Sequence, residues 1–429
     1  MDAPVVPRRA VAAWALYDFA NSGFAATVLA VVFNVYFAQR VVPPEGISIA
    51  GHVLRGPFLW GAAVALSTFV IFVLAPLLGA VADLAGRKKS FLAFFWTLGV
   101  LATSGLVFVT PGRVGLAMAL FGLANIGFAG GNIFYNAFLP ELAPPSRQGR
   151  VSGLGWAVGY LGSFLCLGLN LLLIRFPEKF FLSPANDEPV RAGLLAVGIW
   201  WGLFGWPLLV WGPRDRPLDT RSPGTWARRG WARLVRTGKD LGRHRNLLVF
   251  MGAFALYNDG IETLILTASL IGAGLLGMTP GELILCFLMI QAVAFAGALL
   301  LGRWADRVGS KRVILLTLAV YVGVLLKAYF LESKNEFWAL GAVLGFVLGG
   351  SQAASRSLMS RLVPPGQTAE FFSFYGIVAK FTAIAGPLVF GVAAQAWGLR
   401  AATLSLLPFF VLGGALLTFV RDGAPPPAR

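Results

Sequence analysis

Apolar runs of about 20 residues, separated by short polar segments, occupy most of this 429-residue chain. A helix of roughly 20 apolar residues spans the hydrocarbon core of a bilayer, whereas the strands of a membrane barrel are shorter and alternate in polarity. Hydrophobic residues make up 57% of the chain and charged residues only 13%. A soluble domain is about half apolar and about a quarter charged. The sequence therefore predicts an all-α integral membrane protein.

We predict twelve membrane spans, six on either side of one long polar stretch. This division gives an N-terminal six-helix bundle at 1–213, a linker at 214–246 and a C-terminal six-helix bundle at 247–429. Glycine is frequent within the spans, as the close packing of helices in lipid requires. The spans run near residues 11–39, 58–82, 91–110, 114–138, 152–174, 191–212, 247–276, 282–304, 312–331, 336–360, 370–396 and 400–420.

The charges orient the chain in the membrane. A net charge of +16 would suggest a nucleic-acid partner in a soluble protein, but here the cations collect in the segments of one membrane face. The positive-inside rule then places both termini in the cytoplasm. In the linker, Trp226 and Trp231 interleave with arginines, which predicts a basic amphipathic helix on the inner membrane surface and no nucleic-acid partner. The Arg-rich composition and short loops favour a prokaryotic cytoplasmic membrane.

An eleven-residue pattern occurs twice in the chain. Residues 79–89 read G-x-x-x-D-x-x-G-R-K-K, and residues 302–312 repeat this pattern with Ser310 in place of the Arg and Arg312 in place of the last Lys. A second pair of matching segments ends spans four and ten, where Asn136 and Arg356 are equivalent and lie 220 positions apart. The two halves are therefore repeats, and transporters of this build hold their substrate near the middle of the membrane, between the repeats.

The repeated pattern resembles the signature loop of major facilitator transporters. Segments 17–22, 135–142, 256–260 and 355–357 add a narrower resemblance to the branch that contains the fungal autophagy-related vacuolar effluxer and its bacterial relatives, although Phe19 stands where that branch has Trp. The resemblance implies the major facilitator fold, in which spans one, four, seven and ten line a central cavity. It also implies a monomer and amino acids as the substrate class.

Polar side chains within the spans are the candidates for substrate binding. A charge in the bilayer is expensive, so a charge that is present usually faces a cavity and serves function. These polar residues fall mainly on spans one, four, seven and ten, the spans that the resemblance places around the cavity. The alternative is that some of them only join helices by hydrogen bonds. The candidates are Asp18, Asn21, Asn132, Tyr135, Asn136, Asn258, Asp259, Gln352, Ser355, Arg356 and Lys380.

Carboxylates on spans one and seven and a guanidinium on span ten suit a zwitterion. The forked guanidinium of Arg356 can bind a substrate carboxylate through two bonds, while Asp18 or Asp259 binds the amine. Asp259 and Glu262 are neighbours on a helix, and two desolvated carboxylates resist joint ionisation. Asp18, Asp259 and Glu262 are therefore the candidates for proton coupling. A sodium ion held by Asp18 and Asn21 is the alternative.

The signature loops have another predicted role, as a latch between the two halves. An aspartate at a helix end can cap the positive N-terminus of a neighbouring helix, while the following cations pair with acids. In the resembling family, this loop stabilises the outward-facing state. The latch candidates are Gly79, Asp83, Gly86, Arg87, Gly302, Asp306, Arg307, Gly309 and Arg312.

These features favour a secondary active transporter that moves a small polar solute, most simply an amino acid or similar zwitterion, by alternating access with proton coupling. The partners expected are the solute, protons and the lipid bilayer. An exporter of amphipathic drugs or lipids and a non-transporting membrane sensor are the alternatives. No P-loop pattern, nucleophile arrangement or metal-ligand cluster is present in the sequence, so we expect neither an enzyme nor a cofactor.

Overall fold

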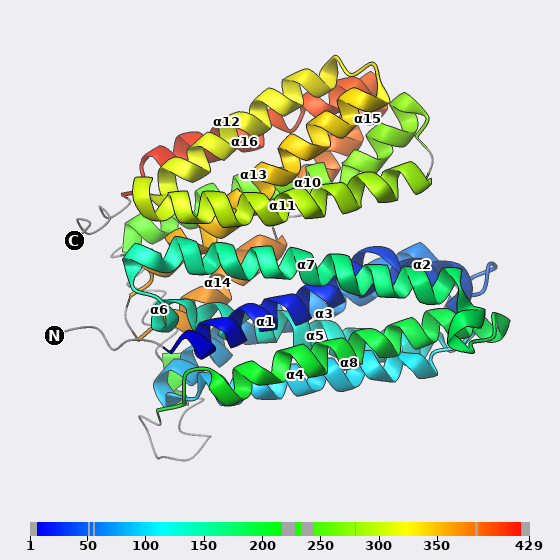
Figure 1. Ribbon diagram of the computed structural model, residues 1–429, viewed down its shortest axis with the longest axis horizontal. Helices are drawn as coiled ribbons and strands as arrows, with labels where there is room; N and C mark the ends of the chain where they lie inside the picture. The colour runs from blue at the N-terminus through cyan, green and yellow to red at the C-terminus, as the bar shows by residue number, and fades with distance from the viewer. Residues whose placement is uncertain are drawn as a thin grey trace. The chain divides into compact units, whose positions relative to one another are not determined.

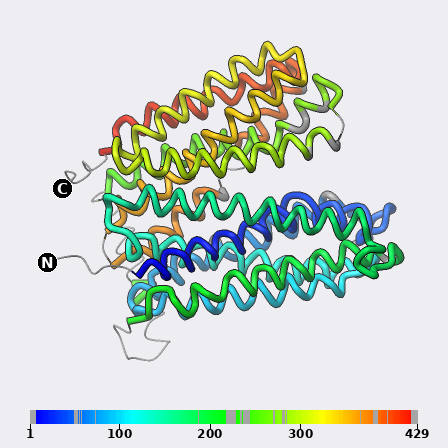
Figure 2. Tube along the Cα trace, viewed as in Figure 1, coloured from blue at the N-terminus to red at the C-terminus, as the bar shows by residue number. Residues whose placement is uncertain are grey.

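The computed structural model describes residues 7–216, 228–232, 235 and 244–421, except residues 50, 51, 55, 279, 365 and 382–384. Figures 1 and 2 show long helices throughout. By its internal contacts the chain divides into two units. We name them the N-terminal unit, with Val6–Tyr135 and Val158–Trp226, and the C-terminal unit, with Asn136–Ala157 and Ala227–Arg429.

The first half of the chain contains eight labelled helices (Figure 1). Two π-helical segments, Ala25–Val31 and Phe37–Val41, continue the first span, and a two-stranded antiparallel sheet, β1 (Ile47–Ile49) with β2 (His52–Leu54), follows it. The helices α4 and α8 pack together and lie side by side in Figure 1. The helices are α1 (Arg8–Phe24), α2 (Phe33–Tyr36), α3 (Gly56–Ala85), α4 (Lys88–Gly105), α5 (Val114–Ala137), α6 (Leu139–Leu142), α7 (Gln148–Arg175) and α8 (Glu188–Trp211).

The second half of the described chain contains seven labelled helices. Ser333 and Glu336 form a reciprocal capping box at the start of α13, which stabilises that helix end. The helices are α10 (Arg245–Leu276), α11 (Pro280–Val308), α12 (Ser310–Tyr329), α13 (Lys334–Leu362), α14 (Thr368–Phe381), α15 (Ala385–Leu404) and α16 (Leu407–Thr418).

Eleven helices of the described chain are long and apolar enough to cross a membrane, and they correspond to eleven of the twelve predicted spans. The span predicted at 370–396 differs. It contains α14, of 14 residues, and the short apolar helix Ala385–Ala394, with residues 382–384 between them outside the described residues. The number twelve stays a prediction. The small sheet was also not predicted, because three-residue strands leave no readable alternation.

The predicted linker is described only in part, at residues 214–216, 228–232, 235 and 244–246. Residues 228–232 are helical, and Trp231 is exposed there. Trp226 lies outside the described residues. The amphipathic helix and the bundle boundaries at 213 and 247 therefore stay predictions.

Both signature turns need glycine for the same reason. Gly86 has a φ angle of 66° and Gly309 one of 97°, a left-handed region that other residues adopt only with strain. Each glycine ends one long helix and lets the next begin within three residues. The spacing of Asp and Gly in the repeated pattern thus encodes a sharp reversal between two spans.

Candidate functional site

In the N-terminal unit, polar and aromatic residues of α1 meet α5. The Asn21 amide donates a hydrogen bond to the Asn132 side-chain oxygen at 2.7 Å. Trp14 donates from its indole nitrogen to the Tyr135 carbonyl oxygen at 2.9 Å, and its ring stacks on the Tyr135 ring with centroids 4.6 Å apart. Asp18 is buried on the same helix. The structure thus brings Asn21 of span one into contact with Asn132 of span four, two of the predicted residues.

Asp18 also lies close to α7. A Cβ atom at Gly159 would come within 3.5 Å of the Asp18 carboxyl carbon and within 2.7 Å of the Ser22 hydroxyl. Because glycine leaves this space open, the α1 backbone approaches α7, and Ser163 donates a hydrogen bond to the Ser22 carbonyl oxygen at 3.0 Å. Gly159 therefore shapes the surroundings of Asp18.

In the C-terminal unit, Arg356 on α13 is 3% exposed and reaches the first turns of α7. Its Nε donates to the Ser152 hydroxyl at 3.0 Å, and one terminal nitrogen donates to the Ser152 carbonyl oxygen at 2.7 Å. The other terminal nitrogen lies 3.4 Å from the Asn136 side-chain oxygen. The guanidinium carbon sits 5.1 Å from the ring centroid of Trp156, a cation–π distance. These contacts hold the plane of the guanidinium in one orientation.

Two residues of this arrangement were missed from the sequence. Ser152 and Trp156 are one helical turn apart on α7, and span five carried no prediction beyond small-residue packing. The spacing of four residues between them could have indicated this, because it places both side chains on one face of the helix. Asn136 and Arg356, the repeat-equivalent pair, were both predicted, and the structure brings them into contact.

Asp259, buried in α10, meets the start of α15. The Gly386 backbone nitrogen donates to both Asp259 oxygens, at 3.1 and 2.9 Å. A Cβ atom at Gly386 would lie 2.8 Å from one of those oxygens, so glycine allows this approach. A carboxylate at a helix N-terminus is stabilised by the unpaired backbone N–H groups there. Asp259 thus has a structural contact beside its predicted role in transport.

The remaining predicted residues lie around this region of the C-terminal unit. Tyr257 and Ser355 share a hydrogen bond of 2.7 Å between their hydroxyls, which joins α10 to α13. Asn258 donates to the Ala379 carbonyl oxygen at 3.3 Å. Glu262 and Gln352 are half-buried on α10 and α13. Lys380 belongs to α14, but its side chain lies outside the described residues.

Asp306, in the second signature loop, caps the N-terminus of α7. Its two oxygens accept hydrogen bonds from the backbone nitrogens of Gly149 and Arg150, each at 2.7 Å. Arg361 on α13 donates to the same carboxylate at 3.1 Å. Asp306 thus caps a helix N-terminus, while the latch between the two halves stays a prediction. Arg361 is a partner that the sequence did not predict. Arg307 and Arg312 are exposed, and Arg312 donates to the Val308 carbonyl oxygen of its own turn.

The first signature loop makes its described contacts within the N-terminal unit. Asp83 is buried, and its carboxylate lies 3.5 Å from the Lys88 ammonium. Gly86 accepts a hydrogen bond from the Arg216 backbone nitrogen at 2.9 Å. Asp215 caps the start of α4 by accepting from the Lys89 and Ser90 backbone nitrogens at 2.7 and 3.0 Å. The start of the linker is therefore bound to this loop.

Lysines of both loops also bind carbonyl groups at helix C-termini. Lys89 donates to the carbonyl oxygens of Val210 and Gly212, where α8 ends. Lys311 donates to those of Thr418 and Val420, where α16 ends, at 2.6 and 2.7 Å. A cation at a helix C-terminus is favourable because the last carbonyls lack backbone partners. The first loop thus also binds the end of α8, and the second loop binds the end of α16.

Glycines bring α7 and α11 into backbone contact beside the Asp306 cap. A Cβ atom at Gly302 would lie 2.7 Å from the Gly149 carbonyl oxygen and 2.9 Å from the Gly153 Cα. A Cβ atom at Gly153 would clash with the Ala298 carbonyl oxygen. Small residues permit this approach, as is usual for helices in lipid.

We expect Gly153→Ala to destabilise the protein by about 1–3 kcal/mol, because the new methyl meets backbone atoms that cannot turn away. The measurement is the thermal melting of the detergent-solubilised protein. Gly168→Ala on the same helix is the matched control, since a Cβ atom there meets nothing within 4 Å. Equal melting temperatures for the two variants would contradict the tight contact of α7 and α11.

Comparison with known proteins places this geometry in a family. The family model described as "Vacuole effluxer Atg22 like" matches residues 62–423. The chain belongs to the Atg22-like family. This result confirms the narrower of the two resemblances that the sequence showed. Among the relatives, the MFS-type transporter YxiO of Bacillus subtilis (strain 168) is 32% identical over 410 residues, covering 95% of this chain and 94% of YxiO.

A fungal relative and two solved structures agree with this assignment. Autophagy-related protein 22 of Yarrowia lipolytica is 26% identical over 412 residues, covering 76% of this chain and 69% of that protein. The structure of the human organic anion transporter MFSD10 matches with a TM-score of 0.71 at 17% identity, covering 96% of this chain and 99% of that one. The proton:xylose symporter XylE also matches with a TM-score of 0.71, at 16% identity, with 96% of each chain covered. This Atg22-like chain has the major facilitator fold and is an MFS-type transporter.

Proposed function

We propose that this Atg22-like transporter moves an amino acid or a similar small zwitterion by alternating access. The observation that carries the proposal is the guanidinium of Arg356, which is buried within a membrane span and held by Ser152, Asn136 and the ring of Trp156. A planar guanidinium held in one orientation suits the two oxygens of a carboxylate. The word "effluxer" in the name of the family model supports a transported solute.

The amine of the zwitterion needs an acidic partner, for which the sequence offers Asp18 and Asp259. The rings of Trp14 and Tyr17 stack on that of Tyr135 in the N-terminal unit, and Trp14 lies one helical turn before Asp18 on α1. Aromatic faces attract ammonium groups, so these rings also favour the amine of the zwitterion near Asp18. Asp18 and Asp259 are both candidates for the amine, and the Asp259 oxygens also accept from the Gly386 backbone nitrogen.

Proton coupling is the second part of the proposal. Asp259 holds the start of α15 through its two oxygens, and Glu262 lies one turn further along α10. A proton bound by Asp259 would remove its charge and weaken its hold on the Gly386 N–H, since charge-assisted hydrogen bonds are the stronger kind. Proton uptake would thereby loosen α10 from α15. We place both termini in the cytoplasm of a prokaryotic cell, with the chain acting as a monomer.

Thermal stabilisation of the purified protein tests the proposal. The panel contains amino acids, dipeptides, organic acids and amphipathic drugs, each at several pH values. A zwitterion at 100 times its dissociation constant should stabilise the folded state by about 2.7 kcal/mol. In Asp259→Asn the effect of that ligand should lose its dependence on pH. Stabilisation by amphipathic compounds alone would contradict the proposed substrate class.

A further inference from the structure

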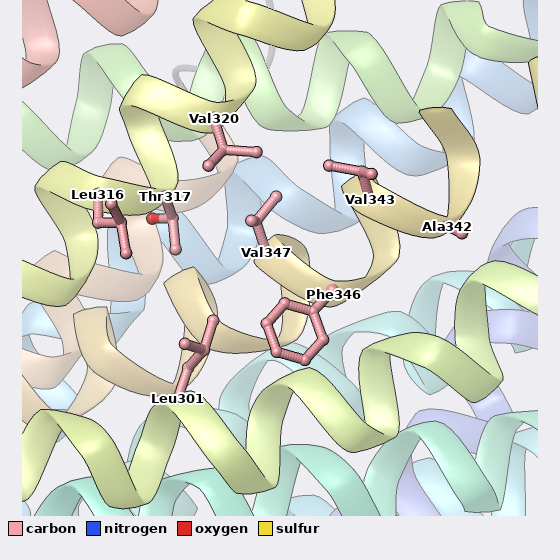
Figure 3. A pocket seen from close by; sticks show the side chains of 8 residues that line it. All are labelled: Leu301, Leu316, Thr317, Val320, Ala342, Val343, Phe346 and Val347. Atoms are coloured by element: carbon pink, nitrogen blue, oxygen red, sulfur yellow. The ribbon is translucent and has the colours of Figure 1, made fainter. Parts of the chain in front are cut away.

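An apolar pocket of about 420 Å³ opens on the side of the C-terminal unit (Figure 3). Three helices line it: α11 contributes one residue, α12 three and α13 four. Its volume falls within the range of about 300–1,000 Å³ typical of small-molecule sites. The lining side chains are Leu301, Leu316, Thr317, Val320, Ala342, Val343, Phe346 and Val347.

The lining offers no place for a polar solute. Thr317 supplies the single hydroxyl group, and it donates to the Ile314 carbonyl oxygen of its own helix at 2.7 Å. The other seven side chains are hydrocarbon only (Figure 3). A polar ligand would lose its hydrogen bonds to water here without replacement, which is unfavourable. The ligand must therefore present hydrocarbon to this pocket.

The pocket lies beside a close contact between α11 and α13. Gly297 and Gly349 bring α11 and α13 into backbone contact, since a Cβ atom at Gly297 would clash with the Phe346 carbonyl oxygen and one at Gly349 with that of Ala294. Beside this contact, Ala342 and Val343 of α13 and Val320 of α12 line the pocket. The space between α12 and α13 is therefore left open toward the side of the bundle.

The depth of the pocket indicates what reaches it. All eight lining residues lie inside the candidate spans Leu285–Val308, Ser310–Tyr329 and Lys334–Leu362. Leu316 is 47% exposed and Val343 is 44% exposed at the mouth. An exposed apolar mouth at that depth faces lipid tails and not water.

One end of the pocket carries groups that suit a lipid headgroup. Trp304 lies three positions after Leu301, and Arg312 lies four positions before Leu316, so each shares a helix face with a lining residue one turn nearer the signature loop. Trp304 is 38% exposed, and Arg312 is exposed. Tryptophan and arginine at a span end are typical of the level of the headgroups. Arginine there attracts anionic lipids.

We infer that this pocket binds one acyl chain of an anionic phospholipid, whose phosphate contacts Arg312 beside Trp304. The hydrocarbon lining selects the chain, and the cation at the mouth selects the charge of the headgroup. This lipid site is separate from Arg356, and it does not depend on the proposed solute.

Lipid binding to the purified full-length protein tests the inference. Native mass spectrometry would compare phosphatidylglycerol with phosphatidylcholine of identical acyl chains. One arginine near an anionic headgroup should give about a fivefold preference for phosphatidylglycerol. Arg312→Gln should reduce that preference to nearly equal binding of the two lipids. Val343→Trp should lower the binding of both, because the indole fills the mouth.

The controls separate this pocket from ordinary lipid contact. Val392→Trp places the same indole on α15, at a residue 67% exposed and outside the pocket, and should leave binding unchanged. Binding in Val343→Trp equal to that in Val392→Trp would overturn the acyl-chain site. Equal binding of the two lipids by the unchanged protein would overturn the role of Arg312.

Discussion

Arg356→Lys should reduce the affinity of the transporter for its solute by roughly 100-fold while the protein remains folded. Lysine keeps the positive charge but loses the fork that reaches Ser152 and Asn136 together. A substrate carboxylate would then keep one charge-assisted bond in place of two. The loss of one such bond weakens the free energy of binding by up to about 3 kcal/mol, which corresponds to roughly 100-fold in affinity. The measurement is counterflow of the stabilising zwitterion in proteoliposomes.

Arg400→Lys is the matched control for this prediction. Arg400 is exposed and donates to the Tyr329 carbonyl oxygen, so the same chemical change there should leave transport unaltered. Size-exclusion chromatography of both variants checks that each is folded and monodisperse. Transport by Arg356→Lys at the rate and affinity of the unchanged protein would remove Arg356 from the substrate site, and the zwitterion proposal with it.

Asp306→Asn should slow transport about tenfold or more without weakening the equilibrium binding of solute. The carboxylate accepts from two backbone nitrogens of α7 at 2.7 Å and from Arg361 at 3.1 Å. An asparagine keeps one acceptor oxygen, loses the charge and turns a donor toward the helix N-terminus. Charge-assisted hydrogen bonds contribute about 1.5–3 kcal/mol each, so the loss of one changes a conformational equilibrium by at least about tenfold.

Two measurements distinguish this effect from damage to the substrate site. Thermal stabilisation by the solute reports binding, and proteoliposome uptake reports the rate of the full cycle. Asp187→Asn is the control, because Asp187 pairs with an exposed Arg40 and such surface pairs contribute little. A normal rate in Asp306→Asn would show that the α7 cap does not govern the conformational cycle.

The capping geometry of Asp306 could be anticipated, but its target could not. The spacing of Asp and Gly predicted a carboxylate at a span end that faces a helix N-terminus, and the left-handed φ angle of Gly309 explains that spacing. Which N-terminus it meets depends on how α7 packs against α11. That packing rests on Gly149, Gly153 and Gly302, and glycines are too frequent in this chain to single those three out.

The partners of Arg356 and Asp259 were missed because common residues carry no distinguishing mark in the sequence. A charged residue in a span is visible in the sequence, whereas its neutral partners are ordinary. Ser152 and Trp156 look like any serine and tryptophan in an apolar run, yet they set the orientation of the guanidinium. Gly386 is one glycine among many, and its backbone nitrogen is what binds Asp259. Backbone donors have no signature in a sequence.

The contact between Asn136 and Arg356 has a consequence for how this protein arose. The two residues occupy equivalent positions of the repeats and lie 3.4 Å apart. In an assembly of two identical halves, a residue at such a place would meet its own copy, as in any two-fold symmetric dimer. Two arginines facing one another would repel, whereas two asparagines can share hydrogen bonds. A single arginine facing an asparagine therefore suits two copies that have diverged better than two identical ones.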